Sequence, residues 1–207
     1  MARSRAVISL AALALLAIVA APTRAALEGN PERGAYLFAA ADCVSCHTDV
    51  KNKGQPLAGG RALATPFGTF YGPNITPDPT YGIGGWSEAE FHRALREGIG
   101  PGRTHLFPVF PFTSFTGMTD QDIADIYAYL RTRPAVAQPN KPHDVSAPFG
   151  WRFTLVFWRL LFFEEGPLAP DPAHDAVWNR GNYLANAVAH CGECHTPRNF
   201  LGAMRAS

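Results

Sequence analysis

The sequence predicts an all-α fold in which two related units follow one another in tandem and the second is incomplete. Helix start and stop signals, long stretches rich in glycine and proline, and a motif that occurs twice support this prediction. Of the 207 residues, 19 are glycine and 18 are proline, and 17% are charged. This composition is typical of a turn-rich globular protein rather than of a coiled coil or a disordered chain.

The N-terminal residues have the pattern of a secretory signal peptide. Arg3 and Arg5 precede an almost uninterrupted apolar run over 6–20, and small alanines follow it. A membrane span needs roughly 20 residues, so we expect export with removal of residues 1–25 rather than a retained anchor. The balance of 18 Lys+Arg against 17 Asp+Glu gives no electrostatic reason to expect nucleic acid as a partner.

All four cysteines lie in two copies of one pentapeptide, C-x-x-C-H. This spacing is the attachment signature of c-type haem, because two thiols three positions apart can add to the two vinyl groups of one haem while the adjacent histidine binds the iron. The sequence therefore predicts two covalently bound haems, the second with less support than the first. The residues that would hold them are Cys43, Cys46, His47, Cys191, Cys194 and His195.

Three other kinds of cysteine site compete with haem attachment. A redox disulfide within each C-x-x-C does not require the histidine that follows. A four-cysteine zinc ribbon usually separates its pairs by roughly 15 to 20 residues, whereas 144 residues lie between Cys46 and Cys191. Ordinary structural disulfides would not place every cysteine in a repeated pattern, so haem attachment is favoured.

The residues that precede the two motifs also match. The run RGAYL begins at Arg33 and the run RGNYL begins at Arg180, and the first cysteine follows these arginines by 10 and 11 positions. We therefore expect each copy to form a short helix that leads directly into its haem-binding turn. Gly34 and Gly181 recur at the second position of the run, where a missing side chain lets another helix approach closely.

Between the motifs the sequence predicts two further helices joined by long loops. Ser87 and the glutamate three residues later form a capping box that opens a helix over 88–97. Thr119 is the predicted N-cap of a helix over 120–131, which could cross the helix before the first motif. Glycine, proline and threonine dominate residues 54–85, which predicts loop with almost no strand.

A proline-rich linker over 136–175 joins the two copies and contains an apolar stretch over 151–163. These 13 residues are too few to cross a bilayer. Arg152 and Arg159 are seven positions apart and share one helical face, while the large apolar side chains point elsewhere. We expect a helix packed between the two haem units; a face that docks on a membrane surface or on a partner is the alternative.

An electron-transfer haem usually has a sixth iron ligand from the protein, and a methionine sulfur raises its reduction potential. Met118, just before the helix over 120–131, is the predicted ligand of the first haem; its alternative role is a hydrophobic staple for that helix. His92 and His105 are the fallback ligands. Met204 is a weak candidate for the second haem, because no helix would anchor it there.

Several short runs outside the pentapeptides resemble the multihaem cytochrome c subunits of periplasmic alcohol and gluconate dehydrogenases and their two-haem relatives. The resemblance extends from about Arg33 to Leu201. Besides the two haem motifs, it rests on PFGT at 66–69, PNITPD at 73–78, GIGGWS at 82–87 and WNRG at 178–181.

The resemblance implies class I cytochrome c domains in tandem, a first domain over 28–135 and the start of a second over 176–207. It implies a periplasmic protein that passes electrons from a partner dehydrogenase towards quinone or a terminal oxidase. Association with a membrane surface is the alternative given above for the linker. In many relatives a methionine precedes the proline at the place of Pro111. Here that residue is Phe110, which leaves Met118 as the nearest substitute.

These observations predict an electron carrier with haem c as its cofactor, not an enzyme, and no catalytic residues. Only 12 residues follow His195, so we expect an incomplete second domain. Either its iron has an open or externally supplied distal position, or the chain is a truncated version of a longer protein. The alternative function is a haem enzyme that uses this open iron, peroxidase-like or thiosulfate-oxidising. Catalysis would need a distal acid or base, and Glu193 lies on the proximal side.

Overall fold

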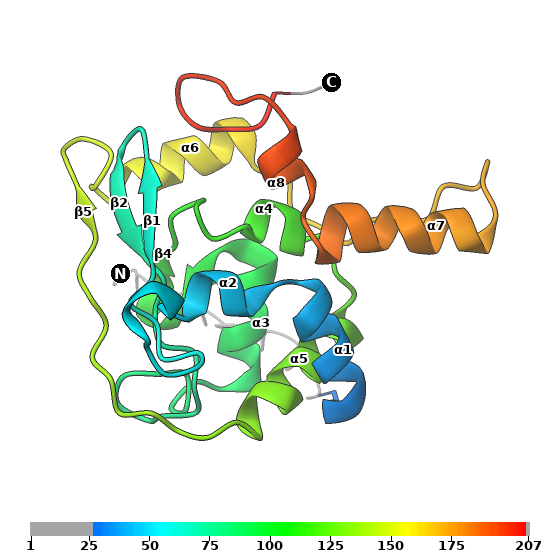
Figure 1. The fold of residues 1–207 in the computed structure, drawn as a ribbon. Coiled ribbons are helices and arrows are strands. Elements are labelled where there is room, and N and C mark those ends of the chain that lie inside the picture. Colours follow the sequence, from blue (N-terminus) through cyan, green and yellow to red (C-terminus); the bar gives the residue numbers. More distant parts are fainter. Residues whose placement is uncertain (1–26, 206–207) are drawn as a thin grey trace, which may run out of the picture.

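The structure, a computed structural model, describes residues 27–205. The predicted signal peptide at 1–25 lies outside the described residues. Three helices frame the first unit, α1 (Pro31–Ala40), α3 (Glu88–Glu97) and α5 (Asp120–Arg131). They lie next to one another in the lower half of Figure 1.

The predicted helix starts are confirmed. Ser87 accepts a hydrogen bond from the backbone of Glu90, whose carboxylate accepts one from the Ser87 N–H, and this capping box opens α3. Gly98 ends α3 in the left-handed conformation, with φ of 64°. Thr119 caps α5 by accepting from the backbone N–H of Asp122 at 3.1 Å. Local sequence signals therefore determined both helices to the residue.

α1 and α5 cross in close contact, as the recurring glycine predicts. Asn30 caps α1, and its side chain accepts a hydrogen bond from the backbone of Arg33. A Cβ atom on Gly34 would lie 1.9 Å from the carbonyl oxygen of Asp125. Since any side chain at this position would overlap the backbone of α5, glycine is required here.

The fold is mainly helical, and five short strands also form within residues 27–205, where the sequence predicted almost no strand. β1 (Ala62–Thr65), β2 (Gly68–Tyr71) and β5 (Asp144–Val145) make an antiparallel sheet in the order β1-β2-β5. β3 (Ile99–Gly100) pairs with β4 (Thr104–His105) in a small hairpin. Sequence patterns missed them because they are short and two of them lie in a run dominated by glycine, proline and threonine.

The second unit begins with α7 (Ala176–Tyr183), which leads through a π-type turn, η3 (Leu184–Val188), to the second motif. This order repeats the helix and turn of the first unit. Buried side chains of η3 join the core of the first unit, so the two units share one core in this region. The other short elements are α2 (Cys43–His47), α4 (Phe112–Phe115), α8 (Gly192–His195), η1 (Val50–Asn52) and η2 (Pro101–Arg103).

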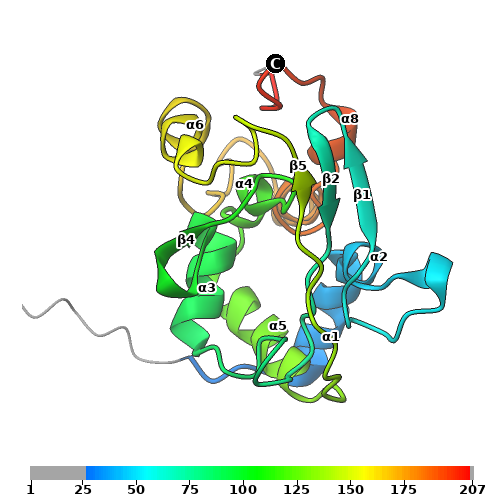
Figure 2. The same cartoon turned by 90° about the vertical axis from the view of Figure 1, so that its left-hand side faces the viewer.

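The apolar stretch of the linker forms α6 (Thr154–Phe162). Figure 2 shows α6 and the C-terminal segment at the end of the molecule opposite α1 and α5. Arg152 donates to the carbonyl of His105, and Trp158 Nε1 donates to that of Leu201 at 3.0 Å. The helix therefore packs between the two units as expected, although Leu160 on its outer face is 78% exposed.

None of the helices within residues 27–205 combines the length and the apolar character needed to cross a bilayer.

Candidate haem sites

The first motif begins where α1 ends. Asp42 connects α1 to α2 in the left-handed conformation, with φ of 48°, and its carboxylate accepts a hydrogen bond from Ser45 Oγ at 2.6 Å. This turn places both thiols of the motif on one short helix. Cys43 packs against the hydrophobic core, and Cys46 follows one turn later.

The cysteines are not paired with one another in the structure. All four are free thiols, so neither motif contains a disulfide. No group of three or more histidine, cysteine, aspartate or glutamate side chains within residues 27–205 could hold a metal ion.

His47 is oriented by a loop that lies directly against the motif. Its Nδ1 is 2.7 Å from the carbonyl oxygen of Pro73. Because a carbonyl can only accept, Nδ1 carries the proton and Nε2 is the nitrogen left to bind a metal. A Cβ atom on Gly72 would lie 1.8 Å from the carbonyl oxygen of Cys46, so the absence of a side chain lets the loop approach closely enough for this contact.

A buried hydrogen-bond network holds the Pro73 carbonyl in place. Asn74 is 2% exposed, and its amide donates to the carbonyls of Val136 at 2.8 Å and Gln138 at 3.1 Å. Its Oδ1 accepts from the backbone N–H and the hydroxyl of Thr76. Sequence analysis missed this role, because partners some 60 positions away leave no local signal beyond an asparagine and a threonine in a proline-rich loop.

The first motif fits haem attachment. Burial raises the pKa of the Cys43 thiol to about 12 and lowers the pKa of His47, yet both side chains keep some accessible surface. Two protonated thiols, an oriented imidazole and an apolar lining are what haem c requires. The partly buried apolar residues packed near this core include Ile75, Trp86, Leu106, Phe110 and Tyr127.

The candidate distal ligands have different surroundings. Met118 is fully buried in the same core as Ile123, and its carbonyl accepts a hydrogen bond from Arg96. This is the position of a hydrophobic staple for α5. His92 Nε2 lies 2.8 Å from an Asp120 carboxylate oxygen. The assignment of Met118 as the iron ligand stays a prediction.

His105 is a half-buried side chain on β4. Its Nδ1 is buried and has no hydrogen-bond partner among the described residues. Burial, followed by the charges of Arg159 and Arg103, lowers the pKa of His105. The neighbouring arginines place this ring towards α6 rather than beside the first motif.

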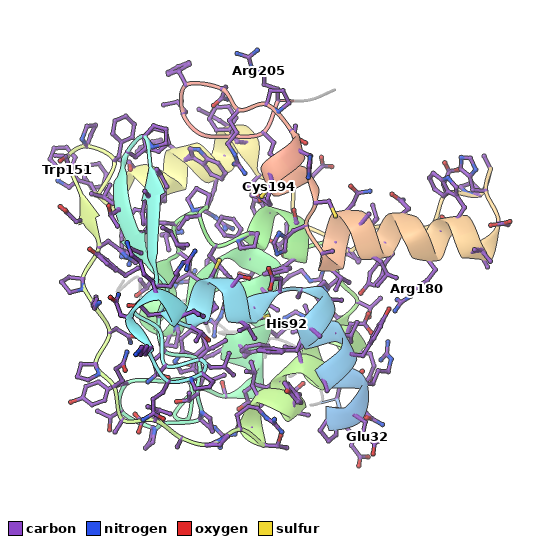
Figure 3. The ribbon with its side chains drawn as sticks, viewed as in Figure 1. Glu32, His92, Trp151, Arg180, Cys194 and Arg205 are labelled. Atoms are coloured by element: carbon purple, nitrogen blue, oxygen red, sulfur yellow. The ribbon has the colours of Figure 1, made fainter. Side chains whose placement is uncertain are left out.

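The second motif docks on the first unit through a residue inside the motif itself. Glu193 accepts hydrogen bonds from Thr113 at 2.6 Å and from Ser114 at 3.2 Å, both on α4, and pairs with Arg198. Figure 3 shows Cys194 at this junction. The two cysteines and the histidine of this motif are exposed. Sequence analysis considered Glu193 only as an acid or base and missed this structural contact.

The two motifs are neighbours in space although 143 residues separate them in sequence. His190, directly before the second motif, has Nε2 3.2 Å from the carbonyl oxygen of Ala41, directly before the first motif's turn. Its ring packs edge-on against Phe115 at 5.3 Å. Burial raises the pKa of Cys46, and the charges of Asp42 and Cys194 add to this effect. The structure therefore brings the two attachment sites together.

Residues 31–134, which contain the first motif, match the cytochrome c family. The chain belongs to the cytochrome c family.

Three relatives illustrate the similarity. The chain is 45% identical over 186 residues to the "Diheme cytochrome c-type" protein of Cereibacter sphaeroides, which covers 86% of this chain and 61% of that protein. It is 44% identical over 202 residues to the cytochrome c subunit of alcohol dehydrogenase (quinone) from Gluconacetobacter polyoxogenes. This match covers 96% of this chain and 42% of that protein. It is 44% identical over 171 residues to the gluconate 2-dehydrogenase cytochrome c subunit of Pantoea cypripedii. This match covers 82% of this chain and 38% of that protein. The chain thus spans less than two thirds of each of these relatives.

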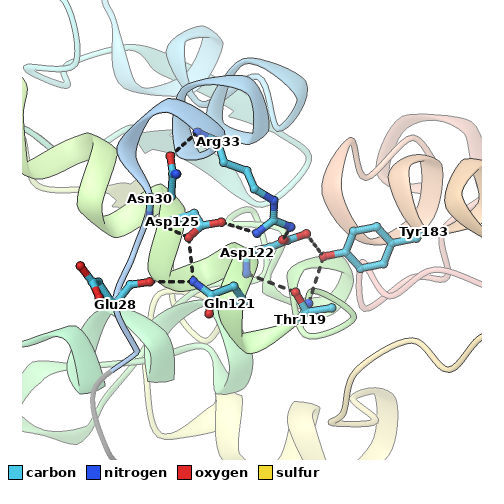
Figure 4. A network of polar contacts seen from close by, with 8 residues as sticks. All are labelled: Glu28, Asn30, Arg33, Thr119, Gln121, Asp122, Asp125 and Tyr183. Carbon is cyan, nitrogen blue, oxygen red and sulfur yellow. Dashed lines mark hydrogen bonds and ion pairs between the residues drawn. The ribbon is translucent and has the colours of Figure 1, made fainter.

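A network of polar contacts ties the second unit of this cytochrome c family member to the first (Figure 4). Asp122 and Asp125 on α5 are both buried and form ion pairs with Arg33 on α1. Tyr183, at the end of α7, donates its hydroxyl proton to Asp122 at 2.6 Å and accepts from the backbone N–H of Thr119 at 3.0 Å. One carboxylate therefore links α1, α5 and α7.

Tyr183 is expected to make the folded state sensitive to alkaline pH. Burial, together with the hydrogen bond to Asp122, raises the pKa of Tyr183 from 10.0 to about 12. Above the lower value the unfolded chain releases a proton that the folded chain keeps, so stability decreases as pH rises through this window and is unaffected below it. Chemical denaturation at several pH values from about 9 to about 12 should show this loss of stability. Tyr183→Phe should make the free energy of unfolding fall less steeply with pH. An unchanged slope would show that other groups cause the alkaline sensitivity.

Proposed function

We propose that the chain is an exported c-type cytochrome that transfers electrons through two covalently attached haems. Cys43, Cys46 and His47 hold the first, and the matching residues of the second motif hold the other. The protein accepts electrons from a dehydrogenase in the periplasm and passes them towards quinone or a terminal oxidase. It has no catalytic residues of its own for substrate chemistry.

The orientation of His47 is the observation that carries this proposal. Bound haem supplies one-electron redox chemistry at its iron. The chain's own residues hold the ring so that Nε2 is available, because the Pro73 carbonyl keeps the proton on Nδ1. The thiols of Cys43 and Cys46 are protonated near neutral pH, since burial raises their pKa values.

The position of the second motif supports electron transfer between the two sites within one chain. Glu193 anchors this motif to α4, and His190 contacts the backbone at Ala41. Residues held by partly buried hydrogen bonds keep a constant separation, and a constant short separation favours rapid electron tunnelling between the sites. The exposure of His195 leaves the second site accessible to an external electron partner.

The relatives support a dehydrogenase as the donor. Proteins similar to this chain are named as cytochrome c subunits of alcohol and gluconate dehydrogenases. The predicted signal peptide supports the periplasmic location. The exposed outer face of α6, which includes Phe157 at 63% and Leu160 at 78% exposure, supports association with a membrane surface.

The haem content of the exported protein tests the proposal directly. Expressed with haem maturation, the chain should carry two covalent haems by pyridine haemochrome assay, because both C-x-x-C-H motifs are intact. Cys43→Ala and Cys191→Ala should each lose one covalent haem, since a single remaining thiol holds haem poorly. A single haem in the unmodified chain would contradict the two-haem proposal, and a high-spin second haem would favour the haem-enzyme alternative.

Met118→Ala tests the distal ligand in the same preparation. If Met118 sulfur binds the first iron, the oxidised protein shows the long-wavelength charge-transfer band of methionine-ligated haem, and the variant loses it. Loss of the band should come with a lower reduction potential, because the sulfur ligand raises it. A variant that keeps the band but unfolds more easily would instead establish Met118 as a hydrophobic staple.

A further inference from the structure

The linker between the two units runs along the first unit before it reaches the second. In Figure 1 it leaves the end of α5 and follows one side of the first unit up to β5. Residues 136–140 of this linker make hydrogen bonds to Ala58, to the loop over 74–76 and to Tyr81. We call residues 136–140 the clamp segment. Since the match to the cytochrome c family ends at residue 134, the clamp segment lies outside the matched domain.

The clamp segment holds Asn74, the residue directly after Pro73. The backbone N–H of Asn74 donates to Asn140 Oδ1 at 2.6 Å. Its side-chain amide donates to the carbonyls of Val136 at 2.8 Å and Gln138 at 3.1 Å. Asn74 is 2% exposed, so these donors would lose their partners without gaining water if the clamp segment moved away.

The contact with Asn140 acts on the same peptide group that orients His47. The Asn74 N–H and the Pro73 carbonyl belong to one planar peptide, in which a fixed N–H sets the direction of the C=O. That carbonyl accepts the hydrogen bond from His47 Nδ1 at 2.7 Å. An unbroken chain of hydrogen bonds thus runs from Asn140 through the peptide to the imidazole. Hydrogen bonds in such a chain polarise and strengthen one another.

The Asn140 side chain is itself fixed on its other side. Its Nδ2 donates to the carbonyl of Tyr81 at 2.8 Å, which leaves Oδ1 as the atom that faces the Asn74 N–H. Gln138 Nε2 donates to the carbonyl of Ala58 at 3.0 Å. The clamp segment is therefore anchored independently of Asn74, so it can constrain the peptide rather than follow it.

The strength of the hydrogen bond at His47 Nδ1 affects the iron that Nε2 would bind. A carbonyl acceptor at one ring nitrogen raises the basicity of the other as a metal ligand. A more basic imidazole favours ferric over ferrous iron, which lowers the reduction potential. A carbonyl that is held less firmly should therefore raise the potential.

We propose that the linker sets the reduction potential of the first haem through Asn140. Asn140 is a positioning residue, which acts on His47 through the Pro73–Asn74 peptide. The inference rests on the function proposed above, because it requires a haem at the first motif. The segment that joins the two units is thereby also a part of the first haem site.

Asn140→Ala removes the acceptor of the Asn74 N–H and is the principal test. A redox titration of the haem-loaded chain, followed by absorbance, identifies the first haem as the component that Cys43→Ala removes. In Asn140→Ala its ratio of reduced to oxidised form at a fixed solution potential should increase about threefold, or about 28 mV, since tenfold is about 59 mV for a one-electron couple. The component that remains in Cys43→Ala should not shift, which makes the second haem an internal reference.

A second readout reports the hydrogen bond itself. The His47 Nδ1 proton of the reduced protein can be followed by NMR. Its exchange with solvent should be faster in Asn140→Ala than in the unmodified chain, because the acceptor carbonyl is held less firmly and the hydrogen bond opens more often.

Two further variants separate positioning from a general loss of structure. Asn140→Asp keeps an oxygen that can accept from the Asn74 N–H, and its negative charge favours ferric iron, so it should not raise the potential. Gln121→Ala is the matched control, because it removes an amide that donates to the Glu28 carbonyl and the Asp125 carboxylate, each at 2.9 Å. It should lower the denaturation midpoint about as much as Asn140→Ala without moving either potential.

The outcomes distinguish this inference from the proposed function. An unmodified chain without haem at the first motif would overturn both. A loaded first haem with the same potential in Asn140→Ala as in the unmodified chain would overturn this inference alone. A rise of equal size in Asn140→Asp or in Gln121→Ala would do the same, because the effect would then not depend on the acceptor at residue 140.

Discussion

Replacing Gly34 with alanine is expected to lower the free energy of unfolding by about 3 kcal/mol or more, the upper range for overpacked sites. The added Cβ would lie 1.9 Å from the Asp125 carbonyl oxygen and 2.9 Å from the Tyr129 Cβ. The backbone of α5 cannot move away without disturbing the ion pairs of Arg33. The midpoint of chemical denaturation, followed by circular dichroism on the haem-loaded chain, measures the loss.

The same substitution at Gly181 is the matched control. Since its Cβ meets no other part of the described chain within 4 Å, alanine should leave stability unchanged or raise it by up to about 1 kcal/mol through its higher helix propensity. The two variants have the same chemistry in matching sequence contexts, so a difference between them reports the α1–α5 crossing. Equal effects would show that the crossing is not the reason for either glycine.

Asp122→Ala is expected to destabilise the protein by about 2 to 3 kcal/mol. The carboxylate is 1% exposed and serves both Arg33 and the hydroxyl of Tyr183. Its removal leaves the buried hydroxyl of Tyr183 with one hydrogen-bond partner fewer. The guanidinium of Arg33 keeps its ion pair with Asp125 and is itself 46% exposed, which limits the loss of stability. Denaturation midpoints of the variant and the unmodified chain give the value.

A double-mutant cycle with Tyr183→Phe tests whether Asp122 also joins the two units. If the hydrogen bond between Asp122 and Tyr183 stabilises the protein, the double variant should lose less free energy of unfolding than the two single variants lose in sum. The reason is that the hydrogen bond can be removed only once. Lys141→Ala serves as the reference for a surface ion pair, here at 3.9 Å from Asp49, and should change stability by less than about 1 kcal/mol. Strict additivity of the first two variants would argue against the link.

The helices of the first unit were predictable because their signals are local. Ser87 and Thr119 lie within four residues of the groups they cap, so their sequence neighbourhood contains the whole interaction. The strands were not predictable for the opposite reason. β2 pairs with β5 through Gly68 and Val145, and neither segment has an alternating pattern of its own.

The candidate sites divide along the same line. The thiols and the histidine of each motif lie within five residues, so their spacing alone indicated haem attachment. The contact that orients His47 comes from Pro73, and the network that holds that carbonyl reaches Val136. The docking of Glu193 on α4 likewise joins residues 80 positions apart. No short-range pattern encodes contacts of this kind.

By itself, the sequence predicted covalent haem attachment, because the motif consists of groups three and four positions apart in the chain. It also determined that two copies of the same helix and turn are present. Only the tertiary structure decided that the two motifs lie beside each other. It also decided that Gly34 is covered while Gly181 is open, because such differences depend on which distant segment packs against each helix.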